Sequence, residues 1–189
     1  MTVTALDPHT ALIIIDLQKG IVSYPTAHPV VGIVQNARQL AQVFRDHDLP
    51  VVLVNVMGGA PGRVEQARPS AERPPDWAEL VPELDPQPRD HRISKKTWGA
   101  FTQTGLEHYL RERGVTQIVL AGIATSIGVE STARQAHELG FHVTLATDAM
   151  TDLHAEAHFN SITRIFPRLG ETGSTQEIIN LLEATRSHR

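Results

Sequence analysis

Residues 117–146 read QIVLAGIATSIGVESTARQAHELGFHVTLA, and their pattern decides the fold. The stretch opens with an apolar, β-branched run at 117–121, which favours a buried strand. Helical apolar spacing then covers 128–139, Gly140 is a typical left-handed helix cap, and a second apolar run follows at 142–146. A strand, a helix and a strand in this order predict a βαβ unit with two parallel strands.

The same alternation of strands and helices covers the rest of the chain. Further strands are expected at 11–15, 51–56, 91–94 and 170–173, and further helices from Pro29 to about Phe44 and at 77–80, 106–113, 155–165 and 175–185. A chain of 189 residues is long enough for one sizeable core and short for two. We therefore predict one doubly wound α/β domain over 1–189, with three layers and a mainly parallel central sheet.

Composition limits the partners and the chemistry. The net charge is −4, and Lys and Arg are dispersed, so neither nucleic acid nor a membrane surface is an expected partner. The absence of cysteine excludes disulfides and thiol catalysis. No signal-peptide pattern opens the chain and no apolar run is long enough to span a bilayer, so a cytoplasmic location is expected. Without a G-x-G-x-x-G or P-loop motif, no cofactor is expected either.

Three features fall at the carboxyl ends of expected strands. Asp16 ends the first strand, Lys95 follows the third, and the turn 123–128 follows the fourth. In open parallel sheets, ligands bind outside these ends, where loops and helix N-termini converge. The pattern thus places an acid, a base and a helix N-terminus at one edge of the sheet, where we expect a small-molecule substrate. The segment 58–92 is rich in Gly, Pro and charge. Long irregular segments of this kind are usually lids or interface arms, and the sequence leaves the role of this one open.

Several segments resemble successive blocks of the isochorismatase-like hydrolase superfamily. These are TALIIIDLQ at 10–18, the stretch that begins KKTWGAF at 95 and ends at 150, and HAEAHFNSI at 154–162. The resemblance covers nearly the whole chain apart from 58–89. It implies the Rossmann-like fold of that family and a hydrolytic activity. Because family members are commonly oligomeric, it also implies a homo-oligomer in which a neighbouring subunit can complete the site.

The resemblance assigns roles to three positions. The family's triad is an aspartate ending the first strand, a lysine ahead of an Ala-Phe pair, and a cysteine in a G-x-x-T-x-x-C-V turn. These positions read Asp16, Lys95 and Gly128 here. Glycine also replaces the cysteine in true isochorismatases, which implies vinyl-ether cleavage without a covalent intermediate. Asp16 would then protonate the enol-ether carbon, water would attack, and pyruvate would leave, while Lys95 orients Asp16 or binds the substrate carboxylate.

Residues around these three positions are expected to form the substrate site. They are Gln18, Arg63, Trp98, Phe101, Ile123, Ala124, Thr125 and Ile127. Gly128 is expected to make room for substrate or water. The backbone N–H groups at 127–129, which form an oxyanion hole in the family's amidases, are expected to be free to bind a carboxylate or to position water.

Two departures from isochorismatases leave the substrate open. Ala60 stands before Pro-Gly where those enzymes have glutamine, and 124–126 reads Ala-Thr-Ser where they have Tyr-Ala-His. Arg63 or Arg68 is expected to hold a substrate carboxylate through a bidentate contact.

Two other functions remain open. Loss of the cysteine is equally compatible with a catalytically silent family member that binds a ligand or forms an oligomer. Ser126 lies one residue away from a G-x-S-x-G elbow, and Asp148 with His154 or His158 follows in the order of a serine-hydrolase triad. His154 and His158 are also four apart, but they miss the H-E-x-x-H pattern, so no metal site is expected.

Overall fold

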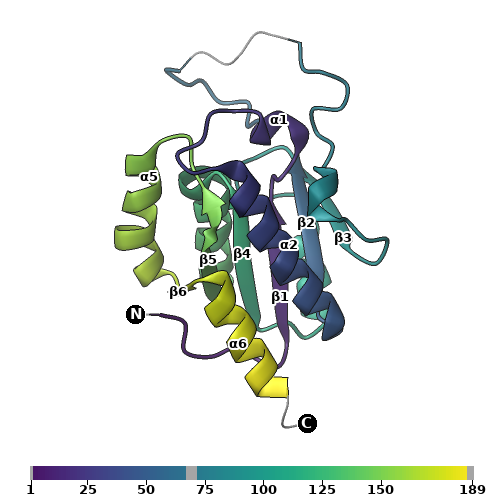
Figure 1. Cartoon of the computed structure of the whole chain (residues 1–189). Coiled ribbons are helices and arrows are strands. Elements are labelled where there is room, and N and C mark those ends of the chain that lie inside the picture. Colours follow the sequence, from purple (N-terminus) through teal and green to yellow (C-terminus); the bar gives the residue numbers. More distant parts are fainter. Residues whose placement is uncertain (1, 67–71, 187–189) are drawn as a thin grey trace.

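The computed structural model describes residues 2–66 and 72–186, and its centre is one six-stranded, all-parallel sheet. The strand order is β3-β2-β1-β4-β5-β6, so the direction of winding reverses between β1 and β4 (Figure 1). The strands are β1 (Thr10–Ile15), β2 (Val51–Val56), β3 (His91–Lys95), β4 (Gln117–Ile123), β5 (His142–Thr151) and β6 (Glu171–Gly173). The predicted doubly wound α/β fold is confirmed.

Helices cover both faces of the sheet. They are α1 (Lys19–Val22), α2 (Val30–Asp46), α3 (Leu106–Glu112), α4 (Glu130–Glu138), α5 (Ala155–Asn160) and α6 (Thr175–Arg186). In Figure 1, α2 and α6 lie side by side across the front of the sheet. Their apolar residues belong to one core cluster, and those of α3 and α4 belong to a second cluster.

The two cores explain why the central strands are apolar throughout. Along β1, Leu12 and Ile14 join the core under α2, whereas Ile13 and Ile15 join the core under α3 and α4. Successive side chains of a strand point to opposite faces, so a strand covered on both faces is apolar at every position. Burial of both faces fixes β1 at the centre of the sheet and holds the residue after it in a defined place.

Some element boundaries differ from the expected ones. The helix expected at 77–80 is wrong: these residues form a turn whose backbone bonds to the segment after β1, and the short 3₁₀ helix η1 lies at Pro82–Leu84. β5 continues five residues beyond 146, so Asp148 lies within it rather than after it. A register shift between β4 and β5 accompanies this longer pairing.

The two expected helices at 128–139 and 155–165 are each divided. A π-helical turn, η2 (Thr125–Val129), precedes α4, and another, η3 (Ser161–Ile165), follows α5. Apolar spacing does not distinguish a wide turn from an α-helix, since both leave the same side chains facing the core. Gly140 has a φ of +80°, as expected for the cap after this helix.

No helix in the part of the chain that the structure describes is both long and apolar enough to cross a membrane.

Candidate active site

A buried ion pair lies at the carboxyl end of the sheet. Asp16 follows β1 in a left-handed conformation, with a φ of +52°, and Lys95 ends β3. β2 lies between these strands. β1 and β3 are therefore two strand spacings apart, or about 10 Å. The long side chain of Lys95 spans this gap, and its Nζ donates to Asp16 Oδ2 at 2.7 Å and to the backbone carbonyl of Thr97 at 3.2 Å.

The surroundings of Asp16 favour its acid form more than is usual for a carboxyl group. Asp16 is 5% exposed and Lys95 is 2% exposed. Burial raises the pKa of Asp16 from 3.8 to about 6, although the charge and the hydrogen bond of Lys95 act in the opposite direction. Its Oδ1 has no hydrogen-bond partner among the described residues. The carboxyl group therefore has a free oxygen that can carry a proton.

Gly128 brings the turn after β4 against this pair. A Cβ atom at this position would lie 3.4 Å from Asp16 Oδ2 and 3.6 Å from Lys95 Nζ, which are ordinary contacts. The same atom would lie only 2.9 Å from Cγ2 of Ile15, so any side chain here requires Ile15 to shift. The structure thus places the three residues of the sequence-based triad together, although they are up to 112 positions apart in the sequence.

Two contacts, one from the residue after β5 and one from α5, hold this turn. Asp152 Oδ2 accepts hydrogen bonds from the backbone N–H of Ser126 at 2.7 Å and from its hydroxyl at 2.8 Å. Thr125 Oγ1 lies 2.8 Å from Nδ1 of His158. The sequence analysis missed Asp152, because the expected strand ended at 146 and nothing in the sequence showed that it continues to Thr151.

The backbone donors of the turn are not arranged as expected. The N–H groups of Ile127 and Val129 both donate to the carbonyl oxygen of Ala124, at 3.1 Å and 3.2 Å. They are therefore engaged inside the turn, since a wide helical turn closes its own hydrogen bonds. The expectation that both were free for a carboxylate or water is wrong.

The expected substrate residues have different surroundings. Gln18 is fully buried, and its amide group bonds to the backbone of Val56 and to the carbonyl of Trp77, so it is structural rather than substrate-binding. Phe101 is half-buried: it packs against the core beside Phe141, with ring centroids 5.9 Å apart, and it also lines a cavity of about 290 Å³. Sequence proximity to Asp16 and Lys95 does not show where a side chain points.

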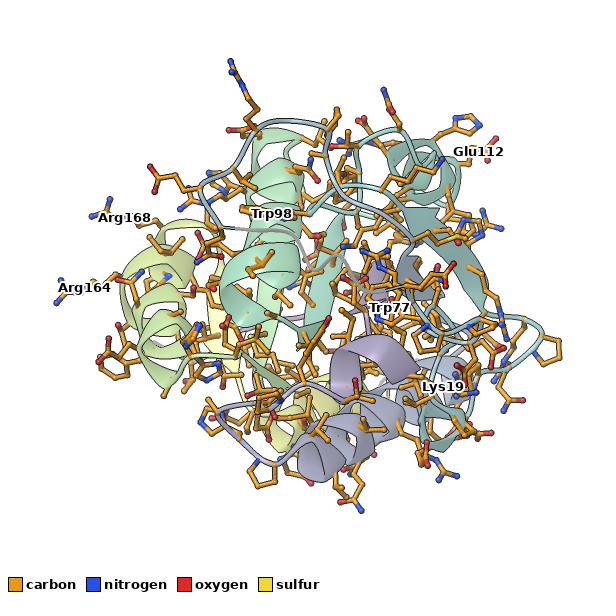
Figure 2. All side chains as sticks on the ribbon, turned by 90° about the horizontal axis from the view of Figure 1, so that it is seen from above. Lys19, Trp77, Trp98, Glu112, Arg164 and Arg168 are labelled. Carbon is orange, nitrogen blue, oxygen red and sulfur yellow. The ribbon has the colours of Figure 1, made fainter. Side chains whose placement is uncertain are left out.

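The remaining expected contacts lie around the turn and on the surface. Ile123 and Thr125 are buried, and Ala124 and Ile127 are half-buried. Arg63 is exposed, and Arg68 lies outside the described residues. Trp98 is 62% exposed. Figure 2 looks onto the carboxyl ends of the strands, and there Trp98 and Trp77 lie over different parts of this end of the molecule.

The pair is covered rather than open. The structure has five cavities of about 290–540 Å³ that are not lined by Asp16, Lys95 or Gly128. In this structure the small size of Gly128 lets the turn approach the pair. That Gly128 makes room for substrate stays a prediction. A substrate must displace part of this cover to reach Asp16.

The geometry does not support the serine alternative. The hydroxyl of Ser126 donates to a carboxylate, Asp152, and not to a histidine. Asp148 accepts hydrogen bonds from the backbone and the hydroxyl of Thr175 at the start of α6, away from Ser126. Among the described residues, no group of three or more His, Asp and Glu side chains is placed to hold a metal ion.

Comparison with known proteins identifies the family. The family model of the isochorismatase domain matches residues 10–177. An uncharacterised isochorismatase family protein of Bacillus subtilis is 46% identical over 177 residues, which are 90% of this chain and 92% of that protein. Streptothricin hydrolase of Streptomyces noursei is 34% identical over 140 residues, 74% of this chain and 48% of that enzyme.

The fold comparison agrees with the sequence comparison. The structure of an isochorismatase family protein from Burkholderia thailandensis superposes with a TM-score of 0.91 and 38% identity, over 95% of this chain and 98% of the other. Both the sequence and the arrangement of the sheet are thus shared over nearly the whole length. The chain therefore belongs to the isochorismatase family of hydrolases.

Proposed function

We propose that this chain hydrolyses a small carboxylated vinyl ether of the isochorismate type without forming a covalent intermediate. The observation that carries the proposal is the buried pair, with Lys95 Nζ 2.7 Å from one carboxylate oxygen of Asp16 and Gly128 beside it. The chain contains no cysteine, so no thiol is available to attack a substrate. The site offers a proton donor in place of a nucleophile.

In this proposal Asp16 is the general acid. Its Oδ2 accepts from Lys95, and the unpartnered Oδ1 carries the proton that is transferred to the methylene carbon of the enol ether. The resulting oxocarbenium ion takes up water, which gives a hemiketal and releases a proton to Asp16. The hemiketal then breaks its ether C–O bond, giving an alcohol and pyruvate. One water molecule is consumed, and Asp16 regains its proton.

Lys95 has two roles in the same reaction. An ammonium group has three N–H donors, and two of those on Lys95 are directed to Asp16 and to the carbonyl of Thr97. The third is the donor that we assign to the substrate carboxylate. A charge-assisted hydrogen bond of this kind fixes the enol ether next to the acid.

The proposal predicts a definite pH dependence. Burial raises the pKa of Asp16 to about 6, and the acid form is the active one. The fraction of active enzyme is therefore constant well below pH 6 and falls about tenfold per unit above it, so about a tenth is active at pH 7. The measurement is kcat/KM against pH with isochorismate, followed as pyruvate release through lactate dehydrogenase, because kcat/KM reports the pKa of the free enzyme. A kcat/KM that rises with pH between 6 and 8 would mean that Asp16 acts as a base.

The same assay separates this function from the silent alternative. A family member that only binds a ligand releases no pyruvate at any pH, whereas the proposed enzyme releases pyruvate most rapidly below pH 6. The pair geometry favours the enzyme, because keeping a carboxyl group and an ammonium group together in the interior costs desolvation free energy that a binding protein does not need.

A further inference from the structure

The turn η2, which places Gly128 against the catalytic pair, is held by two side chains from other parts of the fold. Its first residue, Thr125, contacts His158 of α5, and its second residue, Ser126, is bonded to Asp152, which follows β5. Thr125 is fully buried, and Asp152 is 2% exposed. The placement of Gly128 therefore depends on two contacts that lie outside the catalytic pair.

Asp152 holds the backbone with a buried carboxylate. Its Oδ2 accepts hydrogen bonds from the N–H and the hydroxyl of Ser126, and its Oδ1 accepts one from the N–H of His154 at 3.3 Å. All three donors are neutral groups, so none of these bonds brings a compensating charge. Burial of a carboxylate without such a charge is costly, and packing alone does not account for it. The three bonds instead fix the backbone of the turn relative to the start of α5.

His158 holds the first residue of the turn. Its Nδ1 lies 2.8 Å from Oγ1 of Thr125. A hydroxyl group can donate to the neutral imidazole ring or accept from the protonated ring, so the contact does not depend on the charge of the ring. The ring of His28 lies beside that of His158, with centroids 4.6 Å apart, and His28 is bonded in turn to Thr151 at the end of β5. The turn is thus linked to α5 through a ring that is itself held in place.

We propose that Asp152 and His158 are positioning residues for the catalytic pair. They keep Gly128 against the pair and thereby keep water away from the carboxyl group of Asp16. The pKa of Asp16 is raised by burial and lowered by Lys95, and the charges of Asp152 and His158 are not among its influences. The two residues therefore act on Asp16 through the position of the turn. When the turn moves away, water reaches the carboxylate, the effect of burial weakens, and the pKa of Asp16 falls.

The effect on catalysis rests on the proposed function, in which the protonated form of Asp16 is the active one. When the pKa of Asp16 falls from about 6 to about 5, the protonated fraction decreases about tenfold at pH 7 and only about twofold at pH 5. The value of kcat/KM for isochorismate is expected to fall by the same two factors. A loss of folded protein alone would not reproduce this difference between the two pH values.

The test is a carbon-13 NMR titration of the aspartate carboxyl groups in the full chain, from about pH 4 to about pH 8, with the Asp16 signal assigned by its absence in Asp16→Asn. Thr125→Val keeps the shape of a buried side chain and removes the hydroxyl that contacts His158, and His158→Phe keeps a ring and removes Nδ1. Asp152→Ala removes both bonds to Ser126. We expect each of these variants to lower the pKa of Asp16 by about one unit.

Two further variants serve as controls. His158→Asn is a rescue variant, because an amide group in the place of Nδ1 can still bond to the hydroxyl of Thr125, so we expect the pKa of Asp16 to match that of the wild type. His108→Phe is the control for loss of a histidine. The side chain of His108 on α3 is 79% exposed, and we expect this variant to titrate like the wild type.

An unchanged pKa of Asp16 in Thr125→Val and His158→Phe would overturn the role of His158, and an unchanged pKa in folded Asp152→Ala would overturn that of Asp152. Equal shifts in His158→Asn and His158→Phe would also contradict the role of His158, since the hydrogen bond to Thr125 would then have no effect. The titration needs no substrate. It therefore decides the positioning roles even when the wild type releases no pyruvate from isochorismate, which would count against the proposed function alone.

Discussion

Asp16→Asn is expected to lower kcat for isochorismate by at least about 100-fold, because an amide cannot supply the proton that a general acid transfers. The side chain keeps its size, and its amide oxygen can still accept a hydrogen bond from Lys95, so the fold is retained. The measurement is pyruvate release at pH 5, where about nine tenths of the wild type carries the proton on Asp16. Turnover in the variant within about threefold of the wild type would exclude Asp16 as the acid.

A matched variant separates catalysis from stability. Asp90 is also a buried aspartate paired with a cation, and it lies at the opposite end of the sheet from Asp16. Asp90→Asn is expected to lower the free energy of unfolding by about 3–5 kcal/mol, because it leaves Arg45 without its partner. Its kcat per folded molecule is expected to equal that of the wild type. A similar loss of kcat in both variants would assign the effect of Asp16→Asn to folding.

Lys95→Met is the second variant with a large expected effect. It removes the two influences that lower the pKa of Asp16, the charge and the hydrogen bond of the ammonium group, and leaves burial, which raises it. The decline of kcat with pH therefore moves to higher pH than in the wild type. At the same time kcat/KM at pH 6 falls about tenfold to 100-fold, since a charge-assisted hydrogen bond to the substrate is lost.

Lys96→Met is the control for the loss of a lysine in this segment. Lys96 is exposed and follows Lys95 directly, so we expect its pH profile to match that of the wild type. The two measurements are pH profiles of kcat and of kcat/KM for both variants. An unchanged profile in Lys95→Met, or a shift to lower pH, would contradict the electrostatic role assigned to Lys95.

The fold could be predicted because its determinants are local. A sheet covered on both faces is indicated by the apolar runs of β1, β2 and β4, together with the apolar stripe of α2. The errors occurred where the backbone depends on distant contacts. The segment 77–80 forms a turn because its backbone bonds to α1, and β5 is long because its pairing with β4 resumes at Met150 and Thr151 after a register shift.

The candidate site was predictable only in part. Asp16, Lys95 and Gly128 follow from strand ends and from the family motif, and the structure brings all three together. Side-chain direction was not predictable, so Gln18 was expected at the substrate and instead bonds to the backbone of Val56.

The most direct test of vinyl-ether hydrolysis is the origin of the hydrogen atoms in the pyruvate methyl group. The reaction is run with isochorismate in deuterium oxide, pyruvate is trapped at once as lactate, and the lactate is analysed by mass spectrometry. We predict one deuterium on the methyl carbon, because the proton that Asp16 transfers comes from solvent, and we predict no such lactate with Asp16→Asn. Release of no pyruvate by the folded wild type, or pyruvate without methyl deuterium, would contradict the proposed function.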